Sequence, residues 1–179
     1  MSLWRTGHIP DAARLSQNSP QYIRMRVRLL SVGTRMPDWI NAGVHDYARR
    51  LPRQWAFALA EVPVSRRRLP DPGRCKTDEG ERLMATLSGD THVVALDERG
   101  NHWRTAELVS KIEEWMQFGL DLTFMIGGPD GLSPACMKRA NERWSLSALT
   151  LPHALARVIV LEQLYRASTI LRNHPYHRP

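Results

Sequence analysis

Two turns that carry chemically useful residues lie close together in the second half of this 179-residue chain. The first is Gly127-Gly128-Pro129-Asp130-Gly131, which directly follows an apolar run at residues 120–126. The second is Pro152-His153, which follows a partly apolar run at residues 144–151. Ligands of open α/β sheets bind outside the carboxyl ends of the strands, where such turns gather. We therefore predict that the active site lies between these two turns.

The glycine turn does not match the common nucleotide-binding motifs. Glycine lets a ligand approach the backbone closely because it has no Cβ. However, Pro129 and Asp130 interrupt a G-x-G-x-x-G spacing, and no Gly-Lys-Ser/Thr of a P-loop follows. A dinucleotide site and an NTPase site are therefore disfavoured, whereas a tight structural turn and a small-ligand loop both remain open. Ser133 and Pro134 are expected to begin the next helix as N-cap and first residue.

The second turn joins a predicted strand to a predicted helix. Residues 144–151 begin with the alternation of a strand, and taken alone they favour a buried strand. The alternative is a ligand site, because the small Ser147 and Ala148 leave space and exposed backbone groups could bind adenine-like edges. A helix is expected from about Pro152. His153 and Arg157 share one of its faces, as do Glu162 and Arg166, and both pairs also fit structural ion pairs.

The C-terminal residues 173–179 are dense in His, Tyr and Arg, although a frayed tail is the default interpretation of a terminus. His174 and His177 have no third ligand nearby, so we predict no metal site. The two cysteines, Cys75 and Cys136, are far apart and form no C-x-x-C motif. A disulfide framework is therefore not expected, and a reducing cytoplasm fits the chain.

Composition favours a water-soluble protein with an anionic partner. Hydrophobic residues make up 42% and charged residues 24%, and no apolar run reaches the roughly 18 residues of a membrane span. The formal net charge of +7 favours nucleic acid, with simple solubility as the alternative. Arg66-Arg67-Arg68 is either a solvated loop or an arm that contacts phosphates. Residues 1–24 are expected to be a flexible extension before a single domain at 25–179.

The rest of the chain predicts alternating strands and helices. Strands are expected at residues 26–32, 55–64, 92–96, 120–126 and from 144, and helices at 37–51, 77–87, 105–118, from 134 and from 152. Asp97-Glu98-Arg99-Gly100 is expected to form a turn after the third strand. This order predicts an α/β fold with a mainly parallel sheet of five to six strands. The last helix is apolar nearly all round, which favours a subunit interface.

Four segments carry a resemblance to a known family: residues 32–39 (VGTRMPDW), 126–134 (IGGPDGLSP), 145–153 (SLSALTLPH) and 173–178 (NHPYHR). They resemble the RlmH (YbeA) family, bacterial enzymes that methylate N3 of a pseudouridine in 23S ribosomal RNA. The similarity covers residues 25 to about 178. Asp130 is a mild departure, since the family often has Glu there, and the pattern does not include the segment before Met25.

The resemblance implies a SPOUT-type α/β knot with a C-terminal trefoil knot, a homodimer and S-adenosylmethionine as cofactor. It also implies a substrate presented by the assembled ribosome. The cofactor cleft would be lined by Leu96, Gly128, Leu146, Ser147, Ala148, Leu149, Thr150 and Leu151.

Methyl transfer from a sulfonium is a direct displacement, so the enzyme contributes mainly alignment and electrostatic tuning. The N3 acceptor must also lose a proton. Our catalytic candidates are His153, Arg157, Tyr176, His177 and Arg178, with no base assigned among them. A non-catalytic module that binds RNA or the ribosome is the main alternative. A nicotinamide-dependent enzyme is disfavoured by the missing glycine motif.

Overall fold

The computed structural model describes residues 24–65, 71–87 and 89–176. The predicted N-terminal extension, the Arg66-Arg67-Arg68 cluster, His177 and Arg178 lie outside these residues. The elements in chain order are β1 (Val27–Val32), α1 (Asp38–Arg50), the 3-10 helix η2 (Arg53–Trp55), β2 (Ala58–Val62), α2 (Pro72–Thr86), β3 (His92–His102), α3 (Thr105–Gln117), β4 (Leu122–Ile126), α4 (Pro134–Arg139), β5 (Glu142–Ser145) and α5 (His153–Leu171).

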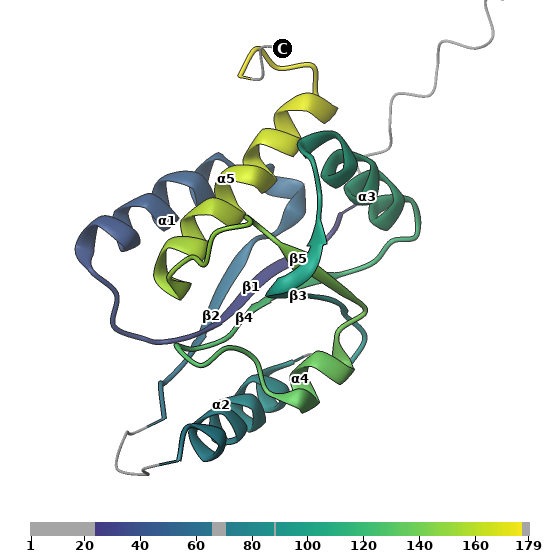
Figure 1. Cartoon of the computed structure of the whole chain (residues 1–179). Helices are drawn as coiled ribbons and strands as arrows, with labels where there is room; N and C mark the ends of the chain where they lie inside the picture. The colour runs from purple at the N-terminus through teal and green to yellow at the C-terminus, as the bar shows by residue number, and fades with distance from the viewer. Residues whose placement is uncertain (1–23, 66–70, 88, 177–179) are drawn as a thin grey trace, which may run out of the picture.

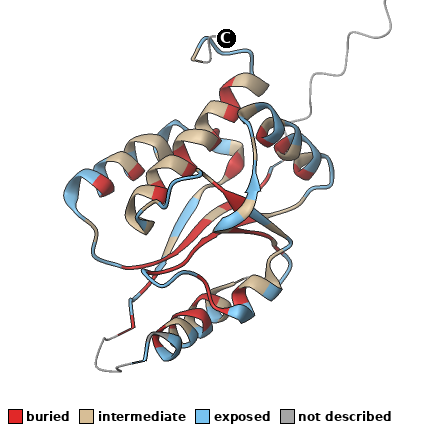
Figure 2. Ribbon diagram, viewed as in Figure 1, coloured by how far each residue is buried: buried red, intermediate tan, exposed pale blue. Residues whose placement is uncertain are grey.

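The five strands form one parallel sheet in the order β2-β1-β4-β3-β5. Helices α1, α3 and α5 cover one face, and α2 and α4 cover the other (Figure 1). The predicted α/β class and parallel sheet are therefore confirmed, with five strands. The central strand β4 is buried along its whole length, which explains why four of its five residues are apolar (Figure 2).

Side chains alternate between the two faces of the sheet, so each face has its own hydrophobic core. On β1, Leu29 packs with α1, α3 and α5, whereas Leu30 packs with α2 and α4. The larger core contains an aromatic cluster in which Trp115 and Trp144 each contact the edge of Phe124. Trp103 stacks on Trp144 with ring centroids 5.2 Å apart. These aromatic contacts fix α3 and β5 against the middle of the sheet.

Helix α2 begins earlier than the sequence predicted. We expected a loop as far as Arg74 and a helix from Thr77, but the helix starts at Pro72. The Asp71 side chain accepts a hydrogen bond from the Gly73 N–H at 2.8 Å, and Pro72 occupies the first turn. Asp as N-cap followed by Pro is a helix-start signal. We had assigned these turn-forming residues to a loop, which was wrong.

The predicted turn at residues 97–100 is part of β3, which continues to His102. The prediction that the strand ends at Leu96 is therefore wrong. The pairing with β5 nevertheless changes register there, because Leu96 and Asn101 both pair with Trp144. Residues 97–100 thus form an irregular bulge that carries Asp97, Glu98 and Arg99.

Two other predicted strands are shorter in the structure. Strand β2 covers only Ala58–Val62, because Trp55 lies in the 3-10 helix and is buried. Strand β5 ends at Ser145, so residues 146–151 are not strand, as we had predicted, but a loop. The alternating pattern of residues 144–151 therefore covers the last two residues of β5 and a loop that has its own side-chain contacts.

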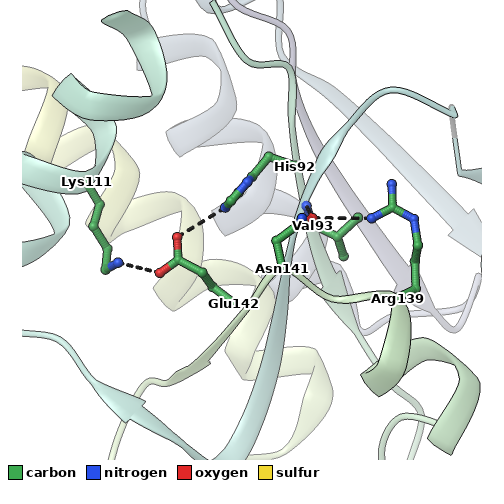
Figure 3. A network of polar contacts seen from close by, with 6 residues as sticks. All are labelled: His92, Val93, Lys111, Arg139, Asn141 and Glu142. Atoms are coloured by element: carbon green, nitrogen blue, oxygen red, sulfur yellow. Dashed lines mark hydrogen bonds and ion pairs between the residues drawn. The ribbon is translucent and has the colours of Figure 1, made fainter. Parts of the chain in front are cut away.

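A polar network fixes the amino ends of β3 and β5 (Figure 3). Glu142 forms an ion pair with Lys111 of α3, and its other oxygen lies 3.1 Å from Nε2 of His92. The Asn141 side chain accepts hydrogen bonds from the Val93 N–H at 2.8 Å and from Arg139 at 3.2 Å. This network holds β5, an edge strand of four residues, in register with β3.

We expect Glu142→Ala to lower the free energy of unfolding by about 1–2 kcal/mol, because it leaves Lys111 and His92 half-buried without their carboxylate. Urea unfolding followed by tryptophan fluorescence measures this change. Glu114→Ala on the exposed side of α3 is the matched control and should change stability by less than about 0.5 kcal/mol. Equal effects of the two substitutions would show that the network is not stabilising.

Candidate active site

The two turns picked out from the sequence form opposite walls of one cleft of about 920 Å³. The cleft lies at the carboxyl ends of β3, β4 and β5, beside the start of α5. Eight of the predicted site residues line it: Leu96, Gly128, Leu146, Ser147, Leu149, Thr150, Leu151 and His153. Ala148 belongs to the same loop but does not line the cleft, and neither do Arg157 and Tyr176.

The cleft combines an apolar floor with a charged rim. Its apolar lining includes Leu96, Ile126, Leu132, Leu146 and Leu151. Its charged lining consists of Asp97, Glu98, Arg99, Asp130, Lys76 and Arg143. We had not predicted most of these charged residues as part of the site. The signal for three of them was the run Asp97-Glu98-Arg99 directly after a buried strand.

Packing within the protein explains why the first turn is made of glycines. A Cβ on Gly127 would lie 2.4 Å from the carbonyl carbon of Gly131, and Gly131 itself has φ +83°. A Cβ on Gly128 would lie 2.5 Å from Oε2 of Glu79. The protein itself thus fills the space that a side chain on Gly127 or Gly128 would need. The segment is a tight structural turn, and it also lines the cleft.

Two serines stabilise the loop at residues 146–151: Ser145 at the end of β5 and Ser147 within the loop. The Ser145 hydroxyl donates to the Ser147 carbonyl at 3.0 Å, and the Leu149 N–H donates to the Ser147 hydroxyl at 2.9 Å. Thr150 donates to Glu98 of the β3 bulge at 3.4 Å, which joins two walls of the cleft. Leu149 is 74% exposed at the edge of the cleft, as expected for an apolar side chain that a ligand would cover.

His153 is half-buried at the start of α5 and faces the loop after β1. Its Nε2 atom lies 3.6 Å from the position of a Cβ on Gly33, a residue with φ +106°. Burial lowers the pKa of His153, and the positive charge of Arg157 lowers the pKa further. The imidazole is therefore neutral at pH 7 and able to accept a proton.

Arg157 is turned away from the cleft and is 1% exposed. It forms an ion pair with Glu61 of β2, and its Nη2 atom donates to the carbonyls of Val32 at 2.8 Å and Gly33 at 2.6 Å. Arg157 therefore affects His153 only through its charge. The hydrogen bonds of Arg157 instead join α5 to the carboxyl ends of β1 and β2. The second predicted pair, Glu162 and Arg166, does form an ion pair.

Tyr176 follows α5 and folds back onto the middle of that helix, away from the cleft. Its hydroxyl donates to Glu162 at 3.3 Å, and its ring contacts Tyr165 edge-on with centroids 4.7 Å apart. Burial, a hydrogen bond with Tyr47 and the charge of Glu162 raise the pKa of Tyr176 to about 12. Tyr176 is therefore a protonated phenol that can donate a hydrogen bond but cannot act as a base near neutral pH.

Two further properties concern the described residues only. No helix within residues 24–65, 71–87 and 89–176 combines the length and the apolar character required to cross a membrane. In the same part of the chain, no three His, Cys, Asp or Glu side chains converge as metal ligands would.

Comparison with known proteins assigns the chain to a family. Residues 25–177 match the family model described as "Predicted SPOUT methyltransferase". The ribosomal RNA large subunit methyltransferase H of Methylococcus capsulatus is 52% identical over 155 residues, which are 86% of this chain and all of that protein. The protein of the same name from Hahella chejuensis is 49% identical over 86% of this chain and 99% of its own length.

Solved structures support the fold alone, because their sequence identities are low. A "probable methyltransferase" from Bordetella pertussis superposes with a TM-score of 0.54 at 16% identity, covering 81% of this chain and 95% of that one. A "probable methylase family protein" from Haemophilus influenzae gives a TM-score of 0.52 at 15% identity, covering 87% and 71%. The family predicted from the sequence motifs is confirmed: this chain belongs to the SPOUT methyltransferases and, within them, to the family of ribosomal RNA large subunit methyltransferase H.

Proposed function

We propose that this chain transfers a methyl group from S-adenosylmethionine to N3 of a pseudouridine in 23S ribosomal RNA, presented by the assembled ribosome. One observation carries the proposal. The segments that hold the family motifs, residues 126–134 and 145–153, are separate in sequence but form facing walls of one cleft. The name of the relatives points to ribosomal RNA as substrate, and the net charge of +7 suits a polyanion.

The lining of the cleft fits an adenosyl cofactor chemically. Leu96, Leu146 and Leu151 provide an apolar surface for a purine ring, and the backbone of the 146–151 loop is available for its polar edge. Asp97, Glu98 and Asp130 provide carboxylates for hydroxyl groups and for positive charge. When bound, S-adenosylmethionine supplies the methyl group. The residues of the chain then align it with the acceptor and exclude water.

His153 is the residue best placed to take the proton from the acceptor nitrogen. It lines the cleft and is neutral at pH 7, because burial and Arg157 lower its pKa. Nε2 is the atom that we assign as proton acceptor, with Arg157 helping to return the imidazole to its neutral form after each turnover. We give Arg157 a positioning role as well, because its hydrogen bonds fix Gly33 opposite His153.

The catalytic candidates meet only if two chains contribute them. His153 begins α5 and lines the cleft, whereas the Tyr176 hydroxyl contacts Glu162, nine residues further along the helix. That spacing corresponds to about 13 Å at 1.5 Å per residue. We propose that the C-terminal segment of one chain, with Tyr176, His177 and Arg178, completes the cleft of a second copy, so that each site contains residues of both chains.

The outer face of α5 supports such a homodimer. Leu155, Ile159 and Ile170 are half-buried apolar side chains that pack on neither hydrophobic core. Their spacing places them on one side of the helix, together with the ion pair of Glu162 and Arg166. A symmetric dimer would bury this stripe against its own copy.

We also propose that the path from β5 to α5 forms the C-terminal trefoil knot. The loop after β5 leaves the edge of the sheet and lines the cleft together with the ends of β3 and β4. Helix α5 then packs against α1 and α3 on the opposite side of the sheet from α4, the helix that precedes β5. The chain thus crosses the carboxyl edge of the sheet between β5 and α5, as the threaded segment of a trefoil knot must.

Methyl incorporation into ribosomes tests the function directly. Ribosomes from a strain that lacks this protein would be incubated with the protein and methyl-labelled S-adenosylmethionine, beside separated subunits and bare ribosomal RNA. We expect label at N3 of one pseudouridine in whole ribosomes and little elsewhere. Absence of label together with absence of cofactor binding would instead favour the non-catalytic RNA-binding module. Label at another atom or base would refute the proposed substrate.

A further inference from the structure

Glu79 is a buried carboxylate for which the proposed reaction has no role. Among the described residues, only two charged side chains are buried, Glu79 at 3% exposure and Arg157 at 1%. Burying a carboxylate costs several kcal/mol unless other groups stabilise it. Arg157 is paired with Glu61, but the one hydrogen bond recorded for Glu79 is the 2.9 Å contact that Oε1 accepts from the Ser65 N–H.

The second carboxylate oxygen lies against the glycine turn. A Cβ on Gly128 would sit 2.5 Å from Oε2 and 3.1 Å from Cδ of Glu79, so the carboxylate occupies the space that the missing side chain leaves. Gly128 itself lines the cleft. Glu79 therefore lies directly behind the cleft wall, and it connects that wall to Ser65, which follows β2.

The neighbouring residue anchors the other end of the same loop. A Cβ on Gly80 would lie 2.1 Å from Oγ of Ser133, which is the N-cap of α4. Two consecutive residues of α2, Glu79 and Gly80, thus contact both ends of the segment between β4 and α4. Helix α2 acts as a rigid support for the glycine turn, and Glu79 is the polar contact in that support.

We infer that Glu79 is a positioning residue for the cofactor cleft: its ionised carboxylate fixes the glycine turn at Gly128 relative to Ser65 and so sets the shape of the wall that receives the adenosyl ligand. This inference rests on the proposed function and names a residue that controls the same site. It predicts that the charge of Glu79, and not only its volume, determines ligand affinity.

Protonation of Glu79 should weaken the support. Burial is the main reason that the pKa of Glu79 is raised, and the neighbouring Asp130 of the glycine turn raises it further. The other charged groups facing it are Arg82, which lowers the pKa, and Asp78, which raises it, both on α2. A protonated Glu79 accepts the Ser65 hydrogen bond less strongly, so ligand affinity should fall as the pH falls through the raised pKa of Glu79.

The test compares Glu79→Gln with wild type in the full-length protein. The ligand is S-adenosylhomocysteine, and its Kd is measured by calorimetry from about pH 7.5 down to about pH 5. We expect Glu79→Gln to raise the Kd about tenfold at neutral pH and to flatten its pH dependence. Glu81→Gln, an exposed position of the same helix, is the matched control and should behave like wild type.

A second measurement does not need the ligand. Hydrogen exchange of the Gly131 amide, which donates to the Gly128 carbonyl at 2.9 Å, should become faster in Glu79→Gln than in wild type at equal thermal stability. An unchanged Kd, pH profile and exchange rate in Glu79→Gln would overturn the inference. Failure of the wild-type protein to bind S-adenosylhomocysteine would overturn the proposed function, and the inference would fall with it.

Discussion

Mixing a His153→Ala chain with a Tyr176→Ala chain is expected to restore about a quarter of wild-type methyl transfer, although each variant alone is inactive. Within one chain, Tyr176 contacts Glu162 in the middle of α5 and does not line the cleft that contains His153. If each site takes His153 from one chain and the C-terminal segment from the other, a mixed dimer has one intact site out of two. Random exchange of subunits makes about half of the dimers mixed, which gives a quarter of the activity.

The His153→Ala variant alone should lose turnover far more than ligand affinity. A positioned general base typically contributes about 100-fold or more to the rate. His153 borders the cleft only at its edge, so the Kd for S-adenosylhomocysteine should change by less than about threefold. In the wild type, the turnover rate should decrease as the pH falls through the lowered pKa of His153, because the protonated imidazole cannot accept a proton.

Several controls make this result decisive. Each variant must form dimers and bind S-adenosylhomocysteine, which light scattering and calorimetry establish. Subunit exchange is verified by tagging the two chains differently and isolating the mixed dimer. An inactive mixed dimer would contradict a site shared between chains. Wild-type turnover by His153→Ala would refute the role of His153.

Replacing Arg157 should cause the largest loss of stability. Arg157→Leu removes the guanidinium that pairs with Glu61 and that binds the carbonyls of Val32 and Gly33. Breaking a buried pair by removing one partner typically costs about 3–5 kcal/mol, because the other groups remain without compensation. Arg157→Lys should recover only part of the lost stability, because the compact lysine ammonium cannot bind several acceptors at once as the planar guanidinium does.

Urea unfolding at one fixed protein concentration measures the effect, because the proposed dimer would make stability depend on concentration. Glu61→Gln is the matched control. The Glu61 side chain is 29% exposed, so Glu61→Gln should lower the free energy of unfolding less than Arg157→Leu does. A loss of less than about 1 kcal/mol for Arg157→Leu would show that the buried arginine is not a structural clamp.

The sequence predicted the fold class through local patterns that the structure retains. The mainly apolar sequence of β4 and the helical spacing of Leu108, Ile112 and Trp115 on α3 both follow directly from burial. The predicted ends of helices and strands were less accurate where the residues of one kind of element resemble those of another. Asp71 and Pro72 begin α2 but were assigned to a loop, and the serines of the 146–151 loop imitate the alternation of a strand.

By itself the sequence determined the family, because the four motif segments are long and contiguous, and it picked out the two turns that line one cleft. Only the tertiary structure decided the roles of the buried charges. Arg157 and Glu79 find their partners 96 and 14 residues away, in Glu61 and Ser65, and such pairings depend on how strands and helices meet. Helical spacing placed Arg157 beside His153, but burial turned its guanidinium towards the ends of β1 and β2. The tertiary structure also places Tyr176 against Glu162 and outside the cleft that His153 lines, and we propose that a second chain brings the two residues together.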